Sequence, residues 1–184
     1  SYEASIKELK GQMGNNLHNV IVGSTENMIM LLTAEVKKLE ASIKELLIKD
    51  ENLNQTYKLV TSVVGIGLAT AVHFIIATEN FTRFSDVRKP ICYCGVAPFK
   101  HESGSSIRGR SKVSHLANKK LKTLLTMAAI CAVRFDPELK LKYEQKVSEG
   151  KPKMSVLNII RAKLIQRIFL VVKRQSIYEV RLVV

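Results

Sequence analysis

The sequence has few of the residues that build disulfide frameworks or metal sites, because its only cysteines are Cys92, Cys94 and Cys131. Their number is odd, and two cysteines at positions i and i+2 seldom bridge to each other. No Cys-x-x-Cys pair is present, and no histidine stands at the ligand spacing that a zinc site needs. We therefore expect the cysteines to be packing residues of a reduced, cytoplasmic protein that binds no metal of its own.

Long hydrophobic runs are also lacking. The longest run near the C-terminus covers residues 168–172, which is far too short to span a bilayer. No segment has the extended basic and aromatic face that binds a membrane surface, so we expect no membrane partner. The chain opens with SYEASIKELK, which is polar and helix-like, and we expect no signal peptide. It does not start with methionine, and we expect it to be a piece of a longer protein.

Acidic residues become scarce after residue 56. Residues 57–184 hold 23 Lys and Arg against eight Asp and Glu, a balance of +15, whereas residues 1–56 hold six Lys against eight acids, a balance of −2. A basic body behind a mildly acidic arm indicates a polyanionic partner, and nucleic acid is the best candidate. We accordingly divide the chain into an arm and linker at 1–56 and a second domain at 57–184.

The arm carries an apolar seam at alternating steps of three and four residues. The seam positions are Val22, Thr25, Ile29, Leu32, Val36, Leu39, Ile43, Leu46, Asp50 and Leu53. Four heptads predict a coiled-coil helix over 22–53, about 48 Å long at about 1.5 Å per residue. Residues 1–13 are predicted to form a short helix that ends in a break at Gly14, Asn15 and Asn16. That helix is too short to cover the seam, and we favour pairing with another protomer, as a homodimer or tetramer.

Two glycines separate the next two predicted helices. The stretch LVTSVVGIGLATA, at 59–71, predicts an apolar helix, a tight turn at Gly65, Ile66 and Gly67, and a second helix from Leu68. Without Cβ atoms, the glycines let the turn adopt positive φ and lie close to another surface. The amides that start the second helix favour an anion such as phosphate. One interpretation is a helix-hairpin-helix that binds a nucleic-acid backbone; the other is an ordinary corner with two packing glycines.

The rest of the second domain is also predicted to be helical. Helices are expected at 68–78, 85–95, 118–134, 136–149 and 153–174, with a loop or irregular hairpin at 98–115. Pro90 should kink or shorten the second of them. The last helix is apolar nearly all round and should lie in the core. The predicted fold class is all-α: a long coiled-coil helix, then a helical domain that contains a helix-hairpin-helix-like motif and a basic loop.

Positive charge is densest between Phe99 and Lys122, where Glu102 is the single acid. The seven basic residues there are Lys100, Arg108, Arg110, Lys112, Lys119, Lys120 and Lys122. The guanidinium groups of Arg108 and Arg110 could hold a phosphate through paired hydrogen bonds. We predict that these residues bind nucleic acid together with the turn at Gly65, Ile66 and Gly67. The alternative is a solvated basic loop.

These motifs carry a resemblance to a known family. The run GIGLATA, followed by FTRFSDVRKPICYCGVAP, ESG, RGR, SKVSH and ANKKLKTLLTMAA, resembles the C-terminal transposase domain of the bridge-RNA-guided recombinases of bacterial insertion sequences. The resemblance covers about residues 59–122. It implies that Ser103, in the Glu-Ser-Gly motif, is the serine nucleophile. It also implies a RuvC-like DEDD nuclease domain, absent from this chain, that holds Mg²⁺. Double-stranded DNA and a guide RNA are the implied partners, and the bacterial cytoplasm is the implied location.

The chemistry of strand joining suits a serine. A serine alkoxide that attacks a DNA phosphodiester forms a phosphoserine link and preserves the energy of the bond for joining another strand. The hydroxyl needs activation, either by His101, two residues away, or by metal ions on the absent domain. Arg108, Arg110 and Lys112 would offset the charge that develops on the phosphoryl group. The alternative for Ser103 is a loop serine without a role.

The sequence thus predicts the DNA-binding and strand-joining domain of an insertion-sequence transposase. By itself the chain is expected to bind nucleic acid and self-associate without cutting DNA, because it lacks the metal-binding domain. Two other classes of function stay open. One is a non-catalytic helix-hairpin-helix module that binds nucleic acid, and the other is a structural adaptor in which the basic surface is incidental.

Overall fold

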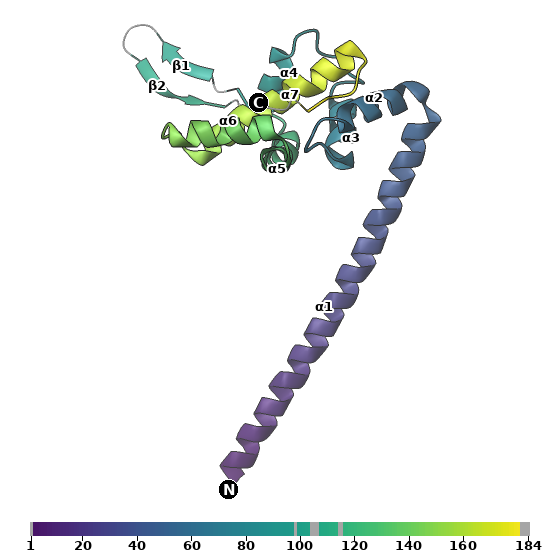
Figure 1. Cartoon of the computed structure of the whole chain (residues 1–184). Helices are drawn as coiled ribbons and strands as arrows, with labels where there is room; N and C mark the ends of the chain where they lie inside the picture. The colour runs from purple at the N-terminus through teal and green to yellow at the C-terminus, as the bar shows by residue number, and fades with distance from the viewer. Residues whose placement is uncertain (1, 98, 104–106, 114–115, 181–184) are drawn as a thin grey trace. The chain divides into compact units, whose positions relative to one another are not determined.

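The computed structural model describes residues 2–97, 99–103, 107–113 and 116–180, with the backbone alone along both strands and most of 2–16. The elements are α1 (Tyr2–Lys49), α2 (Glu51–Thr61), α3 (Leu68–Ala77), α4 (Arg88–Tyr93), β1 (Phe99–Ser103), β2 (Ile107–Lys112), α5 (Lys119–Phe135), α6 (Pro137–Ser148) and α7 (Lys153–Arg174) (Figure 1). The predicted all-α class is confirmed, with one two-stranded hairpin added to the helices. Along the described ranges, no helix has both the length and the apolar character needed to cross a bilayer.

Two compact units make up the chain, Ser1–Leu46 and Leu47–Val184. The first unit is a single helix, since α1 continues without interruption through Gly14, Asn15 and Asn16. The predicted break at these residues is therefore wrong. Glycine and asparagine cost a helix only about 1 kcal/mol or less each, and α1 contains no proline, which would cost about 3 kcal/mol.

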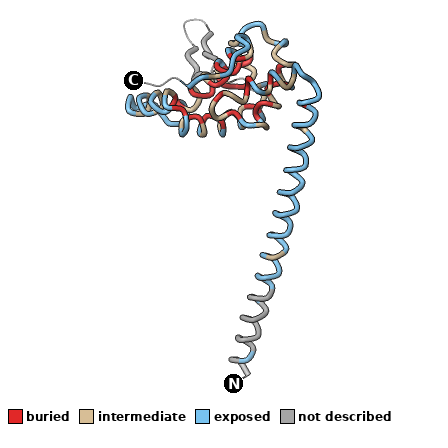
Figure 2. Tube along the Cα trace, turned by 45° about the vertical axis from the view of Figure 1, so that its right-hand side comes forward, coloured by how far each residue is buried: buried red, intermediate tan, exposed pale blue. Residues whose placement is uncertain are grey.

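The apolar seam of α1 is open to solvent in the single chain. Leu32 is 60% exposed, Val36 53% and Leu39 63%. Figure 2 shows that the described part of this helix is exposed along nearly its whole length. An isolated helix gains little stability from such side chains, because most helical stability in proteins comes from packing an apolar face.

The seam does not extend as far as predicted. Helix α1 ends at Lys49, and Asp50 is the N-cap of α2, where its Oδ1 accepts a hydrogen bond from the Leu53 amide at 3.0 Å. Aspartate is a preferred N-cap residue, so it starts a new helix instead of continuing the old one. The predicted heptad through Asp50 and Leu53 is therefore wrong. The compact units divide after Leu46, whereas the sequence placed the division after residue 56.

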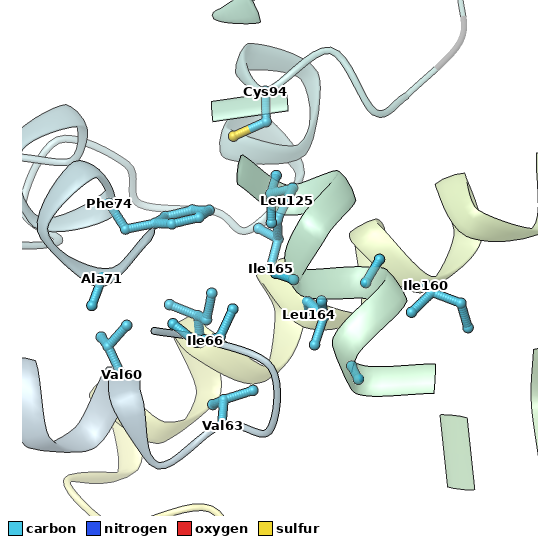
Figure 3. Close-up of a cluster of buried hydrophobic side chains, with 14 of the residues drawn as sticks. Val60, Val63, Ile66, Ala71, Phe74, Cys94, Leu125, Ile160, Leu164 and Ile165 are labelled. Carbon is cyan, nitrogen blue, oxygen red and sulfur yellow. The ribbon is translucent and has the colours of Figure 1, made fainter. Parts of the chain in front are cut away.

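Helix α7 is central to the second unit. It packs against α2, α4, α5 and α6, while α3 packs against α2 and α5. Its side chains Ile160, Leu164 and Ile165 are fully buried, and Figure 3 shows them among side chains from the other helices. Full burial of one such aliphatic side chain contributes about 1.5–3 kcal/mol. The prediction that this helix lies in the core is confirmed.

The predicted helix starts of the second unit are confirmed where a capping residue marks them. The side-chain oxygens of Asn118 and Asp136 accept hydrogen bonds from the Leu121 and Leu139 amides, both at 3.0 Å, and so cap α5 and α6. Helix α4 is shorter than predicted and begins at Arg88, with Pro90 in its first turn, where the missing N–H costs nothing.

All three cysteines are free thiols. Cys94 is buried in the core next to Val96, and burial raises the pKa of its thiol to about 12. A thiol of this kind is protonated and unreactive at neutral pH. The prediction of a packing role is confirmed for Cys94.

Candidate nucleic-acid interface

Residues 99–112, predicted as a loop or irregular hairpin, include an antiparallel pair of strands that lie side by side (Figure 1). Ser103 ends β1 and is paired with Ile107, which begins β2, while His101 is paired with Gly109. The register is irregular between Phe99 and His101. For five predicted site residues the structure describes only the backbone, and their side chains lie outside the described part of the chain: Lys100, Ser103, Arg108, Arg110 and Lys112.

The hairpin starts from a fixed base. We use the name hairpin base for residues 93–97, 113 and 116–118, which flank the two strands. The Asn118 amide donates a hydrogen bond to the Tyr93 carbonyl at 2.8 Å, and the Asn118 side chain donates to the Tyr93 hydroxyl at 3.2 Å. On the other side, the Asn158 side chain of α7 donates to the Val96 carbonyl. The base is thereby tied to the start of α5 and to α7.

A glycine lets the two sides of this base meet. Gly95 has φ of +66°, and a Cβ there would lie 2.6 Å from the Cβ of Ala117 and 3.2 Å from Val113 Cγ1. A substitution would force the chain before β1 away from the chain after β2. The same Cβ would lie 3.6 Å from Lys122 Cδ, so the aliphatic part of Lys122 covers the glycine.

The start of α5 presents positive charge next to the hairpin base. Lys119 and Lys120 are exposed, Lys122 is half-buried, and the first turn of α5 contains no acidic residue. A helix N-terminus already carries a partial positive charge, so lysines there repel it. An anion at this place would relieve the repulsion.

The turn between α2 and α3 packs against α5. Gly65 has φ of +90°, and a Cβ there would lie 2.5 Å from the Ala128 carbonyl oxygen and 3.0 Å from the Ala132 nitrogen. The Ile66 side chain is 5% exposed and points into the core, as Figure 3 shows. Gly67 is exposed, with nothing within 4 Å of the place of its Cβ. Of the three predicted contact residues in this turn, Gly67 is therefore the one that is open to a ligand.

Sequence reasoning missed two buried arginines on α7. Arg167 donates to Asp136 Oδ2 at 2.7 Å and to Glu138 Oε2 at 2.9 Å, and its guanidinium lies 4.7 Å from the Tyr178 ring centroid. Arg161 is 4% exposed and donates to Asn158 Oδ1 at 3.1 Å. Helical spacing carried a signal, since Arg167 falls in register with buried positions 160, 164 and 171.

A pocket of about 720 Å³ opens beside the C-terminal half of α7. Phe81, Phe84 and Phe169 form apolar walls, and Lys163 and Lys173 add positive charge. As far as the structure describes them, the site residues predicted from the sequence do not line it. Nor do three or more His, Cys, Asp or Glu side chains gather as a metal site anywhere among the described residues.

Comparisons with known proteins find one matching family model and several similar proteins. Residues 57–144 match the family model described as "Transposase IS116/IS110/IS902 family". The chain is 26% identical over 160 residues to the pilin gene-inverting protein of Moraxella bovis, covering 86% of this chain and 49% of that protein. It is 24% identical over 169 residues to the insertion element IS110 uncharacterized 43.6 kDa protein of Streptomyces coelicolor, covering 92% and 40%. For the insertion element IS900 uncharacterized 42 kDa protein of Mycobacterium paratuberculosis, the identity is 25% over 153 residues, covering 82% and 37%. The chain thus spans less than half the length of these relatives.

Proposed function

We propose that this chain acts in DNA transposition or recombination as the DNA-binding and strand-joining part of a longer transposase, because residues 57–144 match the model of the IS116/IS110/IS902 transposase family. The resemblance predicted from residues 59–122 is confirmed at the level of the family. The observation that carries the proposal is the hairpin whose first strand ends at Ser103 and whose base adjoins the lysines of α5.

We propose double-stranded DNA as the ligand of the basic surface. Lys119 and Lys120 are exposed in the first turn of α5. Arg108 and Arg110 belong to β2, which precedes α5 in the sequence. Lysine and arginine side chains neutralise backbone phosphates, which supplies most of the affinity of sequence-independent binding. Gly67 is exposed and is the N-cap of α3, which supports a further phosphate contact from the backbone.

Ser103 is the proposed nucleophile. Its hydroxyl gives up a proton, its oxygen forms a bond to the phosphorus of a DNA phosphodiester, and one ester oxygen of the DNA leaves and takes up a proton. The resulting phosphoserine ester is later attacked by a hydroxyl of another DNA strand, which restores the serine. The position of Ser103 supports this role. It is the last residue of β1 and is paired with Ile107, the first residue of β2, at the end of the hairpin away from its base.

The resemblance also implies Mg²⁺ and a guide RNA. The described residues offer no group of three metal ligands, so the proposed Mg²⁺ site does not fit the described part of this chain. We propose that the metal and the guide RNA are held with the help of a further domain, and that this chain without it does not cut DNA.

Self-association through α1 is part of the proposal. The exposed seam around Leu32, Val36 and Leu39 supports pairing with a second copy of the helix, as a homodimer or within a tetramer. Strand exchange needs two DNA segments at once, and paired chains would bring two hairpins into one assembly.

A recombination assay with the full-length protein tests the proposed function. We expect Ser103→Ala to abolish strand exchange while DNA binding persists. Ser105→Ala and Ser106→Ala are the matched controls, since each removes a neighbouring hydroxyl from the same segment. Strand exchange that survives Ser103→Ala would instead favour a non-catalytic nucleic-acid-binding module.

A further inference from the structure

Two arginines on the same helix are equally buried but differently compensated. Arg167 is held by two carboxylates, Asp136 and Glu138. Arg161, 4% exposed, has no carboxylate partner among the described residues. It donates one hydrogen bond, to the neutral Asn158, and its Nε is buried without a hydrogen-bond partner.

An uncompensated guanidinium is costly in the interior. A buried charge is normally paired, and leaving it without its partner is strongly destabilising. Burial alone lowers the pKa of Arg161, with no acidic neighbour to oppose that effect. An apolar side chain at this position would also pack against the core, so packing alone does not explain why the residue is an arginine.

The surroundings of Arg161 indicate what it meets. Its partner Asn158 also donates a hydrogen bond to the Val96 carbonyl, which connects Arg161 to the hairpin base through Asn158. The aliphatic part of Lys122, on α5, covers Gly95, which belongs to the hairpin base. Between residues 88 and 134, ten Lys and Arg stand against a single acid in the sequence. A cation in these surroundings is best compensated by an anion from another molecule.

We propose that Arg161 binds a backbone phosphate of nucleic acid at the hairpin base, with Lys122 as a second cation. This inference rests on the proposed function and adds a contact that holds nucleic acid beside the strand that ends at Ser103. Arginine makes paired hydrogen bonds to phosphate, and the free Nε is one of the donors of such a pair. The long side chain can turn its guanidinium outward while its methylene groups stay buried.

The experiment measures binding and stability of the chain with a variant that keeps an unbranched side chain but lacks the guanidinium. Fluorescence anisotropy would follow a short DNA duplex and, separately, an RNA stem-loop, between about 50 and 200 mM salt. For Arg161→Met we expect about tenfold weaker binding and a salt slope that is smaller by about 0.9 for duplex DNA or about 0.7 for single-stranded RNA segments. The probe that responds identifies the source of the phosphate.

Thermal unfolding separates this role from a structural one. Without nucleic acid, Arg161→Met should unfold at the same or a higher temperature, because the variant removes an unpaired charge. A lower unfolding temperature together with an unchanged salt slope for both probes would overturn the proposal. If Arg161→Met does not fold, Arg161→Lys replaces it: weaker binding at unchanged unfolding temperature supports the paired contact, and unchanged binding overturns it.

Lys163→Met is the matched control, since it removes one positive charge from the same helix at the pocket instead of the hairpin base. An equal loss of affinity in this variant would overturn the proposal, because net charge would then explain both. If the unsubstituted chain binds neither probe, the proposed function fails with it. If the chain binds and Arg161→Met binds equally well, this inference alone fails.

Discussion

Asp136 and Arg167 join the start of one helix to the middle of another. One oxygen of the Asp136 carboxylate accepts the Leu139 amide and caps α6, and the other accepts Arg167 Nη1 at 2.7 Å. The Asp136 side chain is fully buried, and Arg167 is nearly so. One carboxylate therefore fixes the direction in which α6 leaves the core and compensates a charge on α7.

We expect Asp136→Ala to lower the free energy of unfolding by about 3–5 kcal/mol, because it leaves the Arg167 charge without its buried partner. Urea unfolding at neutral pH measures the loss. Glu138→Gln is the control, since Glu138 is about a third exposed and its loss should cost much less. Equal losses in the two variants would contradict the dominant role of Asp136.

The two glycines of the α2–α3 turn should behave differently. Gly65→Ala is expected to cost about 2–4 kcal/mol, because the new Cβ would meet the Ala128 carbonyl and the residue has positive φ. Gly67→Ala has open space and should cost less than about 1 kcal/mol. Thermal unfolding compares them.

Gly67→Ala is also the cleaner test of phosphate binding by the turn. If the backbone there approaches DNA, a folded Gly67→Ala protein binds a short duplex more weakly. Unchanged affinity in this variant would remove the turn from the interface and leave an ordinary helix corner.

The seam of α1 predicts a position-specific effect on self-association. We expect Leu39→Lys to shift the protein toward monomer, because it places a charge in the seam. Leu31→Lys is the matched control, since Leu31 is equally exposed, at 65%, but lies off the seam. Sedimentation equilibrium measures both. A monomeric unsubstituted chain, or equal effects of the two variants, would rule out pairing through the seam.

Cys94 predicts a loss of stability in alkaline solution. Its thiol has an ordinary pKa of 9.0, and burial raises this pKa to about 12 in the folded chain. Between these values only the unfolded chain loses the proton, so the stability is intact below about pH 9 and falls as the pH rises. By about pH 10 this group should cost about 1.4 kcal/mol.

Cys94→Ala removes the titrating group and should flatten that part of the pH dependence. The variant loses some stability at every pH through poorer packing, so the comparison is one of slopes measured by urea unfolding. Parallel curves for the two proteins above pH 9 would show that Cys94 ionises freely in the folded chain.

Local features of the fold could be predicted from the sequence. Asn118 and Asp136 mark helix starts because each caps with its own side chain, within three residues. The apolar spacing of α7 identified a core helix, because burial follows the helical period. The predicted break at Gly14 failed for the opposite reason: helix-weakening residues lower stability by small amounts that the flanking turns outweigh.

The parts that depend on distant contacts could not be predicted. Glycine at position 65 allows close approach to any surface, and the sequence does not say whether that surface is DNA or α5. The compensation of Arg167 depends on a carboxylate 31 residues away in the chain, at Asp136. Helical spacing could have marked Arg161 as buried, but its lack of a carboxylate partner is visible only once the neighbouring elements are in place.

The nucleophile is the central claim, and covalent trapping tests it most directly. The full-length protein would be incubated with Mg²⁺, guide RNA and a nicked target DNA, and any protein–DNA adduct mapped by mass spectrometry. We predict an adduct on Ser103 in the unsubstituted protein and no adduct in the Ser103→Ala variant. Tight DNA binding with no adduct, or an adduct on Ser105 or Ser106, would contradict the account.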